Sequence, residues 1–144
     1  MNPYTYSVSL RFSHPDIDPA EITRQLGLEP ERAWRVGSPR QTPKGTPLDG
    51  VYQESHWYTR LTSEGKGISE DLSLEEHLSH LVAQLDSFKQ FFAQVRADGG
   101  RVELSIGMFG DQNFGFELSP PLLTSIESLH LFLLFDIYPR PQNW

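Results

Sequence analysis

Four cationic residues lie close together in a stretch, residues 32–47, that contains no acid. They are Arg32, Arg35, Arg40 and Lys44. The stretch carries +4 and the whole chain −7, so the remaining residues sum to −11. Trp34 lies among these cations, and a planar guanidinium beside an aromatic ring can bind a carboxylate, a phosphate or a nucleobase. The alternative is that Trp34 anchors the stretch to the core while the arginines form ordinary surface ion pairs with the acidic body.

Two further residues have side chains suited to acid–base chemistry. Asp136 interrupts an apolar run, and a carboxylate buried there needs a partner or takes a raised pKa. In the functional interpretation, Asp136 is a catalytic acid or the floor of a pocket. In the structural interpretation, which the pattern favours, it is a carboxylate near a strand end that pairs with an arginine or faces water. His56, beside Trp57, can act as a general base. No serine or cysteine nucleophile stands in a recognisable elbow, so we predict no catalytic residues.

Metal ligands are sparse in this sequence. His77 and His80 are three residues apart, but the apolar stripe of their helix places His80 on the solvated side, and the metalloprotease pattern of two histidines around a glutamate is absent. The chain has no cysteine, which excludes thiolate catalysis and cysteine-ligated zinc. We therefore expect no metal and no cofactor.

The first half of the chain predicts a strand, a helix, a long loop and a second strand. Residues 4–12 alternate apolar and polar side chains, which indicates a strand with one face on a core. Asp18 and Pro19 are suited to begin a helix and Gly27 to end it. Residues 29–50 hold four prolines and three glycines and are predicted to be a loop; residues 51–62 are predicted to be a strand.

The second half predicts a long helix, a hairpin, a short helix and a last strand. The helix begins with a capping box at Ser73 and runs over residues 73–97. An antiparallel hairpin is expected over residues 102–116, a helix from Ser119 to about residue 128, and a strand over residues 130–138. This last strand is apolar on both faces, which favours a central position in the sheet.

This order predicts one α+β domain over residues 1–144, a two-layer sandwich with helices on one face of a mostly antiparallel sheet, ferredoxin-like in its arrangement. No signal peptide is expected at the N-terminus, and the longest apolar run, residues 131–135, is far shorter than the roughly 20 residues that cross a bilayer. We expect a cytoplasmic protein without a membrane partner. The acidic charge argues against nonspecific binding to nucleic acid and suits a basic protein partner.

Several motifs in this order resemble domain-of-unknown-function family 4279 (DUF4279). They are residues 16–22, 26–30 and 33–37, then Trp57, residues 74–78 and residues 135–138. The resemblance covers nearly the whole chain and implies a small, stand-alone bacterial protein. It brings no established activity and no catalytic residues.

Three functional hypotheses follow from these features. The first is a non-enzymatic binding protein, for instance of the immunity type that neutralises a protein partner. The second is a sensor of a small molecule or anion that binds through Arg32, Trp34, Arg35 and Arg40 of the loop, with Trp57 and Asp136. The third, least favoured, is an enzyme that uses Asp136, His56 and the loop arginines. The sequence makes no prediction of oligomeric state.

Overall fold

The computed structural model describes residues 2–62 and 67–139. In chain order its elements are β1 (Thr5–His14), α1 (Pro19–Leu26), β2 (Arg32–Trp34), β3 (Pro39–Gln41), β4 (Pro47–Val51), β5 (Ser55–Arg60), β6 (Gly67–Ile68), α2 (Leu74–Leu85), the 3₁₀ turn η2 (Asp86–Phe88), α3 (Lys89–Ala97), β7 (Arg101–Gly110), α4 (Pro120–Ser128) and β8 (Phe132–Pro139). The predicted α+β class is confirmed.

The main sheet has the order β2-β5-β1-β7-β8, and β6 pairs with one end of β1. Strand β1 is antiparallel to β5 and β7, whereas β8 lies parallel to β7 and is reached through α4. The predicted ferredoxin-like arrangement is not confirmed. That arrangement is a split βαβ topology, whereas here the two parallel strands that α4 connects are direct neighbours.

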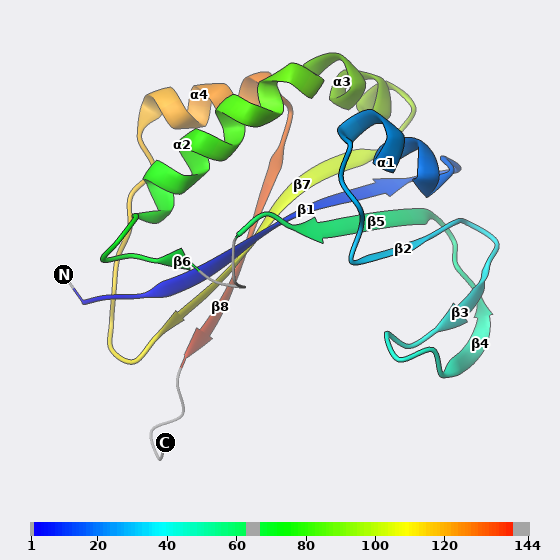
Figure 1. The fold of residues 1–144 in the computed structure, drawn as a ribbon, viewed down its shortest axis with the longest axis horizontal. Helices are drawn as coiled ribbons and strands as arrows, with labels where there is room; N and C mark the ends of the chain where they lie inside the picture. The colour runs from blue at the N-terminus through cyan, green and yellow to red at the C-terminus, as the bar shows by residue number, and fades with distance from the viewer. Residues whose placement is uncertain (1, 63–66, 140–144) are drawn as a thin grey trace.

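The helices α1 to α4 all lie on one side of the sheet, and no helix or strand of the described residues covers the opposite face (Figure 1). The alternation of β1 explains this layering, because Tyr6, Val8, Leu10 and Phe12 are all fully buried toward the helices. Their neighbours along the strand, among them Arg11, face the uncovered side and are only half-buried. One face of β1 therefore lies in the core, and the other belongs to an open surface.

The helices begin at the predicted capping residues. The side chain of Asp18 accepts a hydrogen bond from the Ala20 amide, and Ser73 does the same for the Glu76 amide. Gly27 ends α1 with φ of 69°, a left-handed conformation that glycine adopts without strain. The predicted single helix over residues 73–97 is wrong, because η2 divides it into α2 and α3.

Three other expectations about strands are wrong. The loop predicted at residues 29–50 contains β2 and a separate two-stranded sheet of β3 and β4. Residues 111–119 form no strand, so the predicted hairpin does not exist; Phe114 instead stacks on Tyr4, with ring centroids 5.2 Å apart. The last strand, β8, ends the path of the sheet and is not central.

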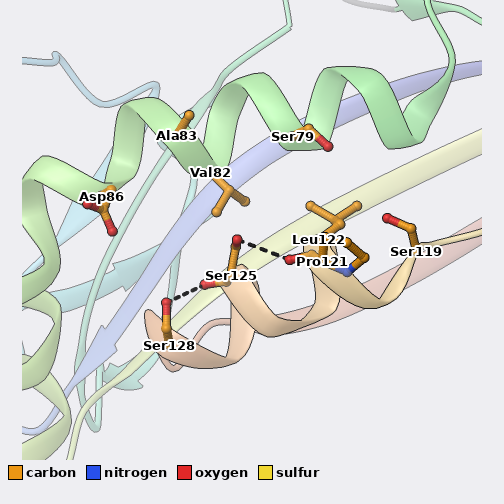
Figure 2. A pocket seen from close by; sticks show the side chains of 9 residues that line it. All are labelled: Ser79, Val82, Ala83, Asp86, Ser119, Pro121, Leu122, Ser125 and Ser128. Atoms are coloured by element: carbon orange, nitrogen blue, oxygen red, sulfur yellow. Dashed lines mark hydrogen bonds between the residues drawn. The ribbon is translucent and has the colours of Figure 1, made fainter.

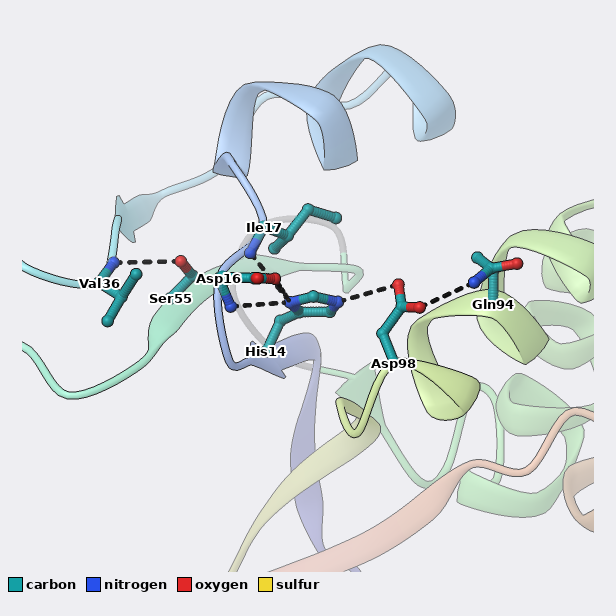
Figure 3. Close-up of polar contacts among 7 residues, drawn as sticks. All are labelled: His14, Asp16, Ile17, Val36, Ser55, Gln94 and Asp98. Carbon is teal, nitrogen blue, oxygen red and sulfur yellow. Dashed lines mark hydrogen bonds and ion pairs between the residues drawn. The ribbon is translucent and has the colours of Figure 1, made fainter.

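A buried histidine fixes the chain reversal between β1 and α1 (Figure 3). His14 is 4% exposed, and its Nδ1 accepts hydrogen bonds from the backbone amides of Asp16 and Ile17, at 3.0 and 2.9 Å. Because Nδ1 is an acceptor, the proton of the neutral ring lies on Nε2, which donates to Asp98 Oδ2 at 3.2 Å. Gln94 also donates to this carboxylate. These two hydrogen bonds, that of Gln94 first, lower the Asp98 pKa. The His14–Asp98 pair links β1 to the end of α3, and both nitrogens of the His14 ring form hydrogen bonds.

Candidate functional site

The uncovered face of the sheet carries a group of cationic and aromatic side chains on β2, β5 and β1. Strand pairing places Trp34 opposite His56, and His56 opposite Ser13. In the next row, Arg32 lies opposite Tyr58, and Tyr58 opposite Arg11. The cationic aromatic cluster is defined here as Arg11, Arg32, Trp34, Tyr52, His56 and Tyr58. All of its side chains are half-buried.

Three rings of the cluster stack closely. Trp34 lies 4.3 Å from Tyr52 and 4.5 Å from His56, measured between ring centroids, with interplanar angles of 12° and 20°. Tyr58 lies beside His56 at 5.8 Å. Such stacked pairs contribute about 0.5–1.5 kcal/mol each beyond the area they bury. The stacked rings therefore form an ordered surface, against which the guanidinium groups of Arg11 and Arg32 pack.

Both guanidinium groups lie over aromatic rings. The Arg32 guanidinium carbon is 4.8 Å from the Trp34 ring, and one of its nitrogens donates to the Gln41 carbonyl at 2.6 Å and to the Tyr52 hydroxyl at 3.2 Å. The Arg11 guanidinium carbon is 5.1 Å from the Tyr58 ring. Neither arginine forms an ion pair with any carboxylate in residues 2–62 and 67–139.

Arg11 has a further peculiarity. Its Nε is buried and has no hydrogen-bond partner among the described residues. A buried donor that is left unsatisfied costs about 1–3 kcal/mol, and more when the group is charged. Arg11 thus carries a positive charge and an unused donor on the open face of the sheet.

The pKa of His56 reflects both the burial of its ring and the positive charge of this surface. Its pKa is lowered from 6.5 to about 4, mainly by burial of the ring and additionally by the charges of Arg11 and Arg32. The imidazole is therefore neutral at pH 7. A neutral imidazole can donate one hydrogen bond and accept another, and an anion placed beside it would raise its pKa.

The structure divides the residues that the sequence predicted for a binding site. Arg32 and Trp34 belong to the cluster, whereas Arg35 lies 3.5 Å from the Asp18 carboxylate and Arg40 donates to the Asp49 carbonyl at 3.0 Å. Trp57 is fully buried and faces the helices, because it alternates with His56 and Tyr58 along β5.

Trp57 donates from Nε1 to Thr23 Oγ1 at 3.0 Å and packs edge-on against Phe12. Its ring lies on the opposite side of the sheet from the cluster. The structure therefore does not bring Trp57 and Trp34 together on one face of the sheet, and Trp57 packs in the core.

Asp136 lies at the opposite edge of the sheet, on β8. It is exposed on β8 and accepts a hydrogen bond from the Tyr138 hydroxyl at 2.5 Å. Strands β1 and β7 separate β5 from β8, which places Asp136 about 14 Å across the strands from His56, and about 20 Å along them, from ordinary sheet spacings. The structure does not bring these two residues together as an acid–base pair.

Sequence reasoning missed Arg11, Tyr52 and Tyr58 as members of the cluster. The signal for these residues is alternation along the strands. It puts Arg11 on the polar face of residues 4–12, and it puts His56 and Tyr58 on one face, opposite Trp57. What the sequence could not supply is the pairing of β1 with β5, whose residues are more than 40 positions apart.

A groove lies between α2 and α4, away from the cluster (Figure 2). It has a volume of about 490 Å³ and is lined mainly by small residues, including Ser79, Ser125 and Ser128. Two of these hydroxyls already donate within α4, that of Ser125 to the Pro121 carbonyl and that of Ser128 to the Ser125 carbonyl. The groove therefore offers few free polar groups to a ligand.

Two other searches of the described residues gave negative results. No group of three or more His, Asp or Glu side chains is arranged to hold a metal ion. Nδ1 of His77 instead lies 3.2 Å from the Tyr6 hydroxyl. No helix in the described part of the chain combines the length and apolar character needed to cross a membrane.

Comparison with known proteins identifies a family. The sequence profile described as domain of unknown function (DUF4279) matches residues 3–140, so the chain belongs to this family. No curated protein and no solved structure matches the chain.

Proposed function

We propose that this DUF4279 domain is a non-enzymatic binding domain, and that it binds an anionic group, a carboxylate or a phosphate, at the cationic aromatic cluster. One observation carries the proposal. Arg11 and Arg32 lie on the uncovered face of the sheet, in one row on either side of Tyr58, and neither forms an ion pair among the described residues. Glu103, which lies opposite Arg11 on β7, pairs with Arg101 instead.

Electrostatics supports an anion at this position. Arg32 and Arg11 lie two strands apart, so their backbones are about 10 Å from one another. Their long side chains can converge on one anion between them. A charge-assisted hydrogen bond from a guanidinium is roughly twice as strong as one between neutral groups. Arg11 would donate to such an anion from its terminal guanidinium nitrogens, because its Nε is buried.

His56 fits the role of a neighbouring donor. It lies beside Tyr58 and stacks on Trp34, and its ring is neutral because of burial and the two arginines. Binding of an anion would offset the charges of the arginines and thus raise the pKa of His56. The site therefore contains its own reporter of anion binding.

The immunity-type hypothesis concerns a different kind of surface. It was motivated by net acidity and a basic partner, whereas the cluster is positively charged. A basic protein would have to bind elsewhere on the chain, and this partner stays a prediction. The observed geometry favours the anion-binding hypothesis, with Arg11, Tyr52, His56 and Tyr58 in place of Arg35, Arg40, Trp57 and Asp136.

The test is an NMR titration of the His56 ring protons with inorganic phosphate, succinate and a nucleoside monophosphate. We expect at least one probe to shift these signals saturably and to raise the His56 pKa. A ligand at a hundred times its dissociation constant should also stabilise the fold by about 2.7 kcal/mol.

Variants make the test specific. Arg11→Gln and Arg32→Gln should each weaken binding at least tenfold, which corresponds to about 1.4 kcal/mol. Arg24→Gln is the matched control, because Arg24 lies on α1 and pairs with Glu21. The proposal fails if none of the three probes moves the His56 signals, or if Arg24→Gln weakens binding as much as the other two substitutions.

A further inference from the structure

Strand β8 presents an apolar edge to solvent. It follows β7 at the end of the sheet, and no other described strand pairs with its outer side. Its large side chains are unusually exposed: Phe132 by 51%, Leu134 by 45%, Ile137 by 56% and Tyr138 by 48%. Four of the exposed large hydrophobic side chains of the described chain therefore lie on this one strand.

Natural edge strands are protected from pairing by shortness, by charged side chains, by prolines or by bulges. The opposite edge of the sheet, β2, follows this rule, because it has only three residues and includes Arg32. β8 has eight residues, runs in regular register along β7, and has Asp136 as its one charged residue; its one proline, Pro139, is its last residue. It retains the features of a strand that is covered by another strand.

We propose that β8 pairs antiparallel with β8 of a second copy of this chain, so that the two sheets become continuous. The reason for choosing a second copy is that β8 is complementary to itself in one register. With Phe135 on the two-fold axis, Phe132 faces the partner's Tyr138, and Leu133 faces the partner's Ile137. Leu134 then faces the partner's Asp136, so no two charges lie directly opposite one another.

Neighbouring registers are poorer. A shift that centres the axis on Leu134 places Phe132 opposite the partner's Asp136 and leaves Tyr138 unpaired. A shift that centres it on Asp136 brings two carboxylates directly face to face, which is destabilising. The register centred on Phe135 pairs seven residues and includes two aromatic pairs of the type that stabilises sheets.

The apolar surface continues from β8 onto the helix layer. Leu123 of α4 is 44% exposed and lines one shallow hollow together with Phe132 and Leu133. A two-fold axis perpendicular to the sheet keeps both helix layers on the same side. The two hollows would then lie on one side of the joined sheet, next to the strand interface.

Charge opposes this association at low salt. Each chain carries −7, and Asp136 lies diagonal to the partner's Asp136 in the proposed register. Salt screens this repulsion, so the dimer should be favoured by salt. Asp136→Asn should tighten it.

The absence of cysteine from the chain permits a test of both the partner and the register. Facing residues in an antiparallel pair have Cβ atoms about 4.5–5.5 Å apart, within reach of a disulfide, whereas diagonal neighbours are about 7–8 Å apart. An equimolar mixture of Leu134→Cys and Asp136→Cys chains should therefore form a disulfide-linked heterodimer under mild oxidation. A mixture of Leu134→Cys and Tyr138→Cys chains, shifted by two residues, is the matched control.

Light scattering on the full chain at 5–200 µM and 0.5 M NaCl gives the second measurement. We expect the mass to approach twice 16.5 kDa and to return to the single-chain value in Ile137→Lys, while Arg32→Gln leaves it unchanged. A single-chain mass throughout this range overturns the proposal. Equal cross-linking in both cysteine mixtures overturns the register, and capture of a different protein by β8 overturns the choice of a second copy.

Discussion

Acidification should destabilise this protein in part through His56. Its pKa is lowered from 6.5 to about 4 in the folded state, first by burial and then by Arg11 and Arg32. Above pH 6.5 the ring is neutral in both the folded and the unfolded chain, so it contributes no pH dependence. Between pH 6.5 and about 4 the unfolded chain takes up a proton that the folded chain does not, and the free energy of unfolding therefore falls with falling pH.

The magnitude follows from the interval between the two pKa values. At about 1.36 kcal/mol for each pH unit, the 2.5 units between 6.5 and about 4 correspond to at most about 3.4 kcal/mol. His56 is only half-buried, so solvent screens part of this energy, and we expect a loss of about 1–2 kcal/mol. Below pH 4 the ring is protonated in both states, and His56 adds no further loss.

Urea denaturation of the wild type and His56→Gln at pH 7, 5.5 and 4 measures this contribution. Carboxylates also titrate near pH 4, but they do so in both proteins, and the difference between the two pH dependences isolates His56. We expect His56→Gln to lose about 1–2 kcal/mol less than the wild type on going from pH 7 to pH 4. Gln90→Ala, at an exposed position on α3 that carries no titratable group, is the control and should keep the wild-type slope.

Two results would refute this reasoning. One is an equal loss of stability in His56→Gln and the wild type between pH 7 and pH 4, because the histidine would then contribute nothing. The other is an NMR titration of the folded protein in which His56 takes up its proton near pH 6.5. Either result would mean that the ring is neither as buried nor as close to the two arginines as the structure has it.

Two further predictions concern residues of the structural framework, His14 and Trp57. His14→Ala should lower the free energy of unfolding by about 2–4 kcal/mol, because two backbone amides lose their acceptor and Asp98 loses a donor; a loss below 1 kcal/mol in urea denaturation at pH 7 would contradict this role. Trp57→Phe should cost about 2–3 kcal/mol through lost packing and an unpaired Thr23 hydroxyl, and it should leave the response of His56 to anions unchanged. A stable Trp57→Phe protein in which His56 no longer responds to anions would contradict this, because Trp57 would then contribute to the binding site.

Much of the fold could be predicted because its signals are local. The alternation in β1 identified the core face correctly, and the caps at Asp18 and Ser73 fixed two helix starts. The break at η2 could not be seen, because Leu85, Phe88 and Phe92 keep helical spacing through it. The hairpin after β7 failed because aromatic residues in an extended segment can pack on a core without pairing as a strand, as Phe114 does on Tyr4.

The candidate site was predicted in part for the same reason. The sequence singled out Arg32 and Trp34 because cations and an aromatic residue are close together there. It placed Arg35 and Arg40 in the same group, although the chain bends between them and each finds its own partner, Asp18 and the Asp49 carbonyl. Arg11, more than 20 residues earlier, joins the site only through strand pairing. Proximity in sequence was a poor guide to proximity on the sheet.

The position of β8 was the most informative disagreement. A strand that is apolar on both faces is expected between two others, and yet β8 lies at an edge. Pairing with a second copy would remove this conflict, because β8 would then be central in the joined sheet although it is terminal in each chain. The cationic aromatic cluster lies on β2, β5 and β1, and at least one strand separates it from that interface. The two proposals can therefore fail independently: Arg32→Gln should weaken anion binding without changing the mass, and Ile137→Lys should separate the chains without changing the response of His56.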